Sequence, residues 1–247
     1  RDVYAKANLM FYVSDHVRNL MCSKLLFDLS YIKPKPIYVD TIEKFDKLWT
    51  RIKTEEIVAV DTETKNLSVK FNAIHTIQFA FEEKKGYLIP VDHPDTPFSP
   101  KERRYIKARL RRFFNAKPGK YAVKYLITQY GMFDLRVLRQ ELGIPVIRHK
   151  VWEITAGEYC LDENRTQLAK KPFNTKHGNL QQIFMVYGND HYKTAAFSKE
   201  DRSDSTKTRL DNPDFIEYGC MDVQSIFGIH LMQQERAKYL TVGDKPY

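Results

Sequence analysis

EEIVAVDTETKNL, residues 55–67, joins a strand of buried character to a pair of acids. The apolar residues 57–60 are followed directly by Asp61 and, two residues later, by Glu63. Because side chains alternate along a strand, both carboxylates point to the same face. Two acids this close repel unless a cation lies between them, and Mg²⁺ and Mn²⁺ prefer oxygen ligands. The pair therefore predicts a metal site, with the solvated end of a strand as the alternative.

Strands and helices alternate on both sides of this stretch. Alternating patterns and apolar runs predict five strands, at residues 36–40, 57–61, 73–81, 85–91 and 121–129. Helical spacing predicts helices at residues 41–53, 99–114, 178–188 and 213–240. Thr41 and Ser99 are suitable capping residues for the first two helices. This alternation, with one hairpin between the third and fourth strands, predicts an α/β domain with a mixed five-stranded sheet flanked by helices.

The N-terminal part is predicted to form a separate extension. Residues 7–27 have the pattern of an amphipathic helix, and the KPKP linker at residues 33–36 cannot continue it. We therefore expect a helical extension and linker over residues 1–35 and the main domain over residues 36–247. Residues 198–212 are polar enough to form a mobile loop. The first residue is Arg1 rather than Met, which predicts a piece of a longer protein.

The composition places the chain among globular proteins. It has 247 residues, of which 43% are hydrophobic and 29% charged. No run approaches the roughly 18 apolar residues of a membrane span, and the N-terminus has no signal-peptide pattern. The three cysteines are too far apart for a zinc site or a disulfide framework: Cys22, Cys160 and Cys220. We expect an intracellular reducing compartment such as the cytoplasm, which is compatible with a viral protein acting in a host cell.

The positive charge is concentrated in one segment. The net charge is +9, and residues 101–124 contain ten Lys or Arg and a single acid, Glu102. Such a segment suits phosphate binding, and it is equally compatible with a solvated helix face. This pattern alone assigns none of its residues to a site.

Two later features add carboxylates to the predicted metal site. Asp134 follows a strand and precedes an apolar helical pattern, so it is either a ligand at a strand-to-helix junction or a helix N-cap. Tyr218 and Asp222 are four residues apart on the last helix and share one face. Apolar neighbours predict that this helix is buried, and a buried Asp needs a partner. The alternative is a Tyr–Asp pair on the helix surface.

Together these segments resemble the motifs of one family. VAVDTETKNL, QYGMFDLRVL and EYGCMD, in this order, resemble the three motifs of the DEDD superfamily of 3′–5′ exonucleases in its Tyr variant. That variant includes RNase D and the proofreading domain of polymerase I-type (family A) DNA polymerases. The resemblance covers about residues 36–240 and implies an RNase H-like fold. The His variant is excluded, because no His precedes an Asp by five residues near the third motif.

The resemblance also implies a set of site residues. Four carboxylates would hold two divalent metal ions, Mg²⁺ or Mn²⁺: Asp61, Glu63, Asp134 and Asp222. Tyr218 would orient the attacking water. The Thr64 backbone and Leu67 would contact the 3′-terminal base and sugar of the nucleic acid. Two aromatic residues, Tyr130 and Phe133, could stack on an unpaired base. For the two aromatic residues among these, core packing is the alternative.

One position departs from the family pattern. The family usually has Asn four residues before the Asp of the second motif, where this chain has Tyr130. The four expected metal ligands are all present, so the sequence still predicts an active enzyme. Contacts to the terminal nucleotide, or the hydrogen bonds that support the site, are expected to differ.

The resemblance predicts a metal-dependent 3′–5′ exonuclease that removes nucleotides from single-stranded or frayed DNA. We expect it to be the proofreading domain of a DNA polymerase whose polymerase domain continues C-terminal of this chain, with no membrane association. One alternative is an RNA-trimming exonuclease similar to RNase D. The other is a nuclease-like fold kept as a non-catalytic nucleic-acid-binding module, which the four retained acids disfavour.

Overall fold

The computed structural model describes residues 35–65, 73–161, 183, 208–210, 212–238, 241–242 and 245–246. The expected N-terminal extension over residues 1–35 lies outside these ranges except for its last residue. The expected helix at residues 178–188 lies outside them except for Ile183, and so does most of the polar stretch 198–212. The chain divides into two compact units, and the larger contains Pro34–Ile154 and Ala195–Gly228. The proposed boundary between residues 35 and 36 stays a prediction.

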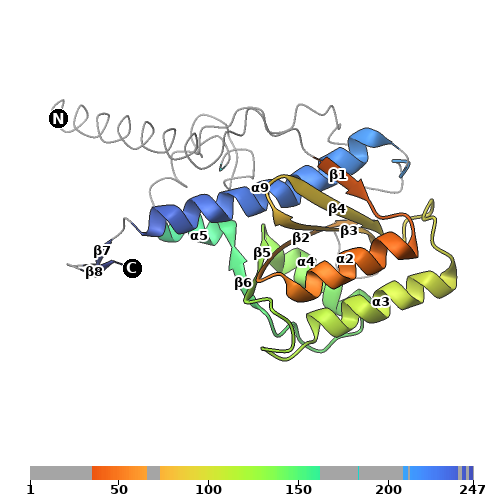
Figure 1. Cartoon of the computed structure of the whole chain (residues 1–247), viewed down its shortest axis with the longest axis horizontal. Helices are drawn as coiled ribbons and strands as arrows, with labels where there is room; N and C mark the ends of the chain where they lie inside the picture. The colour runs from red at the N-terminus through yellow and green to blue at the C-terminus, as the bar shows by residue number, and fades with distance from the viewer. Residues whose placement is uncertain are drawn as a thin grey trace. The chain divides into compact units, whose positions relative to one another are not determined.

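A mixed six-stranded sheet forms the centre of the larger unit (Figure 1). Its order is β1 (Lys35–Tyr38), β4 (Lys85–Pro90), β3 (Ile74–Glu82), β2 (Ile57–Thr64), β5 (Tyr125–Thr128) and β6 (Lys150–Glu153). β3 is antiparallel to both of its neighbours, and the other three pairs are parallel. The expected α/β class and the hairpin between β3 and β4 are confirmed.

The expected number of five strands is wrong, because the sequence pattern missed β6. This strand has four residues, KVWE, at the edge of the sheet, and none of them is fully buried. A short edge strand with solvent on much of its surface needs no apolar alternation, so period-two patterning gives no signal for it. Its pairing with β5 supplies the evidence instead.

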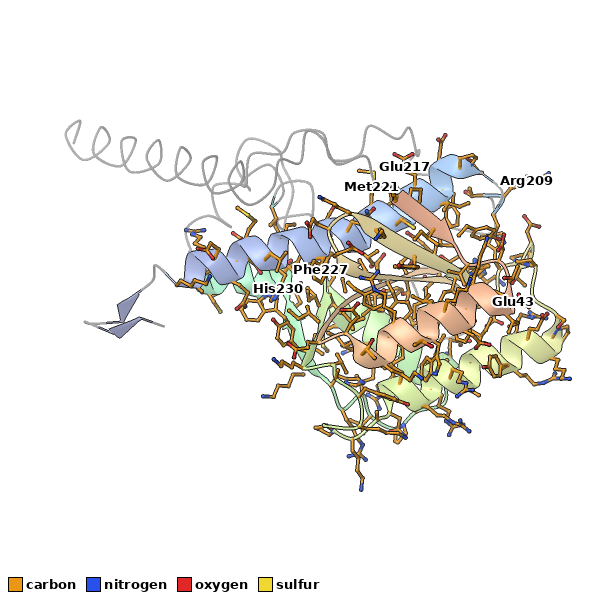
Figure 2. The ribbon with its side chains drawn as sticks, in the orientation of Figure 1. Glu43, Arg209, Glu217, Met221, Phe227 and His230 are labelled. Atoms are coloured by element: carbon orange, nitrogen blue, oxygen red, sulfur yellow. The ribbon has the colours of Figure 1, made fainter. Side chains whose placement is uncertain are left out.

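Helices α2 (Ile42–Thr54), α3 (Pro100–Phe114) and α4 (Gly131–Glu141) cover one face of the sheet. The Thr41 side chain accepts a hydrogen bond from the Lys44 N–H at 3.3 Å. Ser99 and Glu102 form a reciprocal capping box, and Pro100 occupies the first turn. Both predicted helix starts are therefore confirmed. Apolar side chains of the helices and of β2 form one core, with Val58 and Val60 on the β2 side. Figure 2 shows side chains filling the space between the sheet and α2 and α3.

Helix α9 (Pro213–Ala237) begins in the larger unit, where it packs on the opposite face of the sheet. Leu88 of β4 joins Phe215 and Cys220 of the helix in a second apolar cluster. The helix approaches β4 closely at Gly86, where an added Cβ would lie 2.6 Å from the Cys220 carbonyl oxygen. This close packing fixes the first half of α9 against the sheet, beside the second half of β2, which contains Asp61 and Glu63.

The smaller unit contains most of α5 (Ile154–Leu161) and the end of α9. Within it, the Gln233 side chain donates a hydrogen bond to the buried Glu158 carboxylate at 3.0 Å. The strands β7 (Thr241–Val242) and β8 (Lys245–Pro246) pair with each other. Among the described helices, none combines the length and the hydropathy that a membrane span requires.

Candidate metal centre

Strand β2 places two carboxylates on the sheet face that α9 covers. Val58 and Val60 point into the core beneath α2 and α3, so the alternate residues Asp61 and Glu63 point the other way. β2 pairs with β3 along this stretch, with Asp61 opposite Gln78. The register shifts just after Glu63, at the end of the ladder. The side-chain alternation expected from the sequence therefore holds at both acids.

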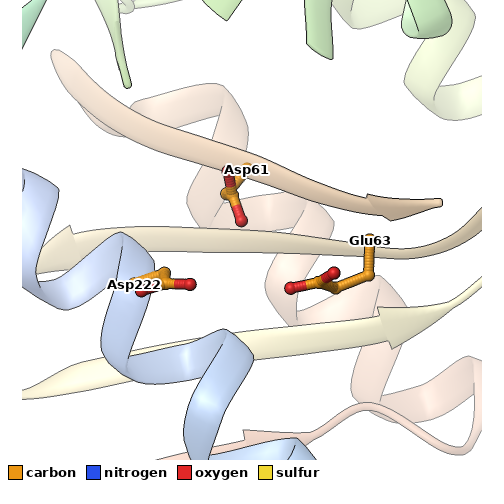
Figure 3. A group of neighbouring side chains, drawn as sticks. All are labelled: Asp61, Glu63 and Asp222. Carbon is orange, nitrogen blue, oxygen red and sulfur yellow. The ribbon is translucent and has the colours of Figure 1, made fainter. Parts of the chain in front are cut away.

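Helix α9 supplies the third carboxylate. Asp222 points from the helix toward Asp61 and Glu63, and Figure 3 shows the three side chains converging on one space. One carboxylate oxygen from each of the three lies within 4.8 Å of the others. Asp222 is 8% exposed, and the two β2 acids are half-buried. In the described part of the chain, no other group of His, Cys, Asp and Glu converges in this way.

The donor set fits a hard divalent cation. All three groups offer carboxylate oxygens, the ligands that Mg²⁺ and Mn²⁺ prefer. Three negative charges this close repel each other, and partial burial strengthens the repulsion by lowering the local dielectric constant. A bound divalent cation would relieve this repulsion, so Asp61, Glu63 and Asp222 are the residues that would hold it.

Asp134 lies near this cluster but is not part of it. It is in the first turn of α4, it is 5% exposed, and its Oδ1 accepts a short hydrogen bond from the Thr62 hydroxyl. Burial raises the pKa of the Asp134 carboxyl to about 6, and the charge of Asp222 adds to this rise. The hydrogen bond from Thr62 acts in the opposite direction. Three acids converge, and the Thr62 hydroxyl holds the fourth, Asp134. The expected role of Asp134 as a metal ligand stays a prediction.

The alternative reading of Asp134 as a helix N-cap is wrong. Helix α4 begins at Gly131, three residues earlier, and the N-cap position is Tyr130. No side chain makes a capping hydrogen bond there. The earlier start places the carboxylate inside the first turn, where it accepts a hydrogen bond from the Thr62 hydroxyl.

Tyr218 lies one turn before Asp222 on α9. It is 8% exposed, so it is a buried residue of the helix and not part of a surface pair. The i, i+4 spacing puts the phenol and the Asp222 carboxylate on the same side of α9. The expected role of Tyr218 in orienting water stays a prediction.

The residues expected to contact a nucleotide have different environments. Thr64 is buried at the end of β2, and Phe133 packs against the main core, which favours the packing alternative for that ring. Tyr130 is 46% exposed and has a left-handed backbone, with φ 50°, at the start of α4. Its N–H donates to a Glu153 carboxylate oxygen at 3.0 Å. Leu67 lies outside the described residues.

Sequence reasoning missed Thr62, Met132 and Glu153. Thr62 is the middle residue of the D-x-E pattern, and strand alternation alone says only that its side chain points away from the two acids. Its partner Asp134 is 72 residues away in the sequence, so only the packing of α4 reveals the pair. Met132 is 67% exposed beside Tyr130, and a single exposed apolar residue gives no recognisable pattern.

Comparisons with known proteins agree with this geometry. Residues 36–234 match a protein family described as 3′–5′ exonuclease. The EXO domain of Aedes aegypti Nibbler has a similar structure, with a TM-score of 0.57 and 14% identity over 83% of this chain and 90% of that domain. Comparison with curated protein sequences gave no significant match.

Two further solved structures share the architecture. Escherichia coli RNase D has a TM-score of 0.56 and 14% identity, over 83% of this chain and 45% of that protein. Brucella melitensis NrnC with bound Mg²⁺ has a TM-score of 0.51 and 15% identity, over 81% of this chain and 78% of that protein. At these identities the likeness concerns the fold, and it confirms the expected RNase H-like architecture.

Proposed function

The chain belongs to the 3′–5′ exonuclease family, and we propose that it removes 3′-terminal nucleotides from single-stranded or frayed DNA in a reaction that requires divalent metal ions. The observation that carries this proposal is the convergence of Asp61, Glu63 and Asp222, which come from two distant motifs. Carboxylates gathered in this way can hold divalent cations, which stabilise the strongly negative transition state of phosphodiester hydrolysis.

The roles of the acids follow from their positions. Asp61, Glu63 and Asp222 would hold the metal, and the family resemblance implies two ions. When bound, Mg²⁺ or Mn²⁺ would polarise the scissile phosphate and lower the pKa of the attacking water. Asp134, held by Thr62, adds a carboxylate beside this set. Its hydrogen bond keeps the orientation of the buried group fixed.

Tyr218 is proposed to orient the attacking water. A free phenol has a pKa of about 10, so it is a poor base at neutral pH and acts better as a hydrogen-bonding group. The position of Tyr218 one turn from Asp222 supports this role. Tyr218→Phe is expected to slow hydrolysis severalfold while the protein keeps its fold, and an unchanged rate would remove the hydroxyl from the mechanism.

Tyr130 and Thr64 are proposed to meet the terminal nucleotide, together with Leu67. The exposed ring of Tyr130, two residues before the exposed Met132, offers a surface on which an unpaired base can stack. Stacking tolerates any base, which suits an enzyme that degrades strands of varied sequence. Phe133 is better suited to support this surface from the core.

Proofreading for a DNA polymerase is the biological role that we propose, with a polymerase domain following in the full protein. The motif resemblance to family A polymerases supports it. RNA trimming is the second candidate, because the RNase D structure that resembles this chain is described as an exoribonuclease involved in structured RNA processing. We also propose a reducing intracellular compartment, since the two described cysteines, Cys160 and Cys220, are both free thiols.

Matched DNA and RNA oligonucleotides of one sequence test this proposal. With Mg²⁺ present, the DNA strand is expected to shorten from its 3′ end faster than the RNA strand. Faster digestion of RNA would favour the second candidate. Asp61→Ala together with Glu63→Ala is expected to abolish digestion of both while the fold is kept, and undiminished digestion by this double variant would refute the metal-site assignment.

A further inference from the structure

Helix α3 carries a row of exposed cations. A helix turns by about 100° per residue, so four of its Lys and Arg residues fall within one sector of about 100°. This α3 basic face comprises Lys101, Arg104, Arg111 and Arg112. Exposed Ala108 lies in the middle of the sector. At about 1.5 Å per residue, the row extends for roughly 16 Å along the helix.

Four other cations of residues 101–124 have partners within the protein. Arg103 and Lys107 both contact the Asp92 carboxylate, the former at 3.8 Å. Lys124 pairs with Glu56 at 2.7 Å, and Arg109 stacks over the Tyr105 ring at 5.0 Å.

Within the described part of the chain, the four cations of the α3 basic face make no such ion pair. The sole acid of the helix, Glu102, is occupied by the capping box with Ser99. The row therefore repels itself unless a negatively charged partner lies along it.

This face lies on the other side of the sheet from the metal site. Ile106, Leu110 and Phe113 of α3 pack into the core shared with Val58 and Val60. The carboxylates of β2 point the opposite way, toward α9. Figure 1 shows α3 and α9 on opposite sides of the sheet. Figure 2 shows side chains with nitrogen ends projecting outward from α3. The α3 basic face is thus not a wall of the metal site.

We propose that the α3 basic face binds the phosphate backbone of a nucleic-acid strand, at a distance from the 3′ end that is being removed. This inference rests on the proposed function, because it takes nucleic acid to be the substrate. Arg guanidinium groups match phosphate oxygens in a bidentate fashion. A row of roughly 16 Å spans several phosphates, since each strand of a duplex carries one per about 3.4 Å. The small side chain of Ala108 lets a backbone approach the helix.

An acidic protein is a poorer match for this surface. Protein interfaces usually have a core of exposed aromatic or other large apolar side chains. The large exposed apolar residues in the described part of the chain are Tyr130, Met132, Val146, Val151 and Tyr159. None of them is on α3, so the helix offers charge and little else. This composition is typical of a surface that holds phosphates without reading a sequence.

Ala108→Glu, compared with Ala108→Gln, tests the proposal. Both substituents are good helix formers of nearly equal shape, and they differ in charge. The new carboxylate would lie one turn from Arg104 and from Arg112, where it pairs with cations and supports the helix. Binding of single-stranded DNA of about 20 nucleotides, with metal removed by a chelator, is expected to weaken roughly 10-fold for the Glu variant relative to the Gln variant. The dependence of log Kd on log salt is expected to fall by about 1 to 2.

A short substrate separates this surface from the metal site. A trinucleotide is too short to reach both, so all three proteins are expected to hydrolyse it at the same rate with Mg²⁺. Equal Kd values for the two variants would overturn the proposal. A slower trinucleotide reaction confined to the Glu variant would overturn it too, since the effect would then act at the metal site. Competition by polyglutamate as strong as that by DNA, at equal charge concentration, would overturn the assignment to phosphates.

The proposed function and this inference can fail separately. If the unaltered protein hydrolyses no oligonucleotide but binds long DNA in an Ala108→Glu-sensitive manner, the proposed function is refuted and the α3 basic face is supported. If it hydrolyses oligonucleotides and both variants bind long DNA equally well, the inference is refuted and the proposed function stands.

Discussion

Glu63→Gln is expected to stabilise the metal-free protein while it weakens the metal site. Glu63 lies within 4.8 Å of two other carboxylates, Asp61 and Asp222, measured between their closest ligand oxygens. At this distance two unit charges repel by about 1 kcal/mol at the dielectric constant of water and by about 3.5 kcal/mol at an effective value of about 20. The figure for water is a lower bound at this partly buried site, so the two pairs together give a gain of at least roughly 2 kcal/mol.

Thermal unfolding in a chelator measures this gain. For a chain of this size, roughly 2 kcal/mol raises the melting temperature by about 4–8 °C. Saturating Mg²⁺, at about 100 times its Kd, is expected to stabilise the unaltered protein by about 2.7 kcal/mol and the variant by clearly less. In the chelator the variant therefore melts at the higher temperature, and the difference between the two melting temperatures shrinks or changes sign when Mg²⁺ is added.

Glu83→Gln is the matched control. Glu83 lies in the turn between β3 and β4, outside the carboxylate cluster, so its neutralisation is expected to change stability by less than about 0.5 kcal/mol with or without Mg²⁺. The reasoning is refuted if Glu63→Gln does not raise the melting temperature in the chelator. It is equally refuted if Mg²⁺ stabilises the variant as much as the unaltered protein.

Three further perturbations test the packing around the site and the smaller unit. Thr62→Val removes the hydroxyl that donates to the buried Asp134 carboxylate, so chemical denaturation should show a free energy of unfolding lower by about 1–3 kcal/mol. Thr62→Ser retains the hydroxyl and should keep most of the stability and activity. Gly86→Ala places a Cβ against the α9 backbone, so it is expected to lower the free energy of unfolding by about 1–3 kcal/mol and to slow hydrolysis by moving that helix. The control is Gly228→Ala, whose Cβ meets nothing closer than 3.9 Å and which should leave stability unchanged or raise it. Burial lowers the pKa of His230 from 6.5 to about 4, so the folded state binds fewer protons than the unfolded state between these values. The contribution of neutral His230 to stability is complete above pH 6.5 and is lost as the pH falls toward 4. Chemical denaturation at pH 7 and at pH 4.5 measures this loss: between the two pH values the unaltered protein should lose roughly 2–3 kcal/mol more free energy of unfolding than His230→Gln.

Much of the fold could be predicted from short stretches because its signals are local. The capping residue Thr41 fixes the start of α2, and the capping box of Ser99 fixes the start of α3. The alternation around Asp61 and Glu63 predicts their common face without any knowledge of the rest of the sheet. Strand β6 gave no such signal, because an edge strand owes its conformation to its neighbour and not to its own pattern.

The convergence of the acids was predictable only through the family resemblance. Spacing along α9 puts Asp222 on the same side as Tyr218, but only the packing of α9 on the sheet brings it to Asp61. Helix α4 begins three residues before Asp134, where no capping side chain signals its start. Gly131 packs so closely on the side chain of Thr128 that no Cβ would fit there, and this local contact has no recognisable sequence pattern.

Release of the 3′-terminal mononucleotide from a 3′-labelled DNA strand tests the central claim most directly. The unaltered protein is compared with Asp222→Asn, which keeps the shape of the side chain and removes one charge from the cluster of three carboxylates. The account predicts release by the unaltered protein with Mg²⁺, none in a chelator, and a loss of at least about 100-fold in Asp222→Asn at equal Mg²⁺. Release that proceeds equally well in the chelator, or that is unchanged in Asp222→Asn, would contradict the account.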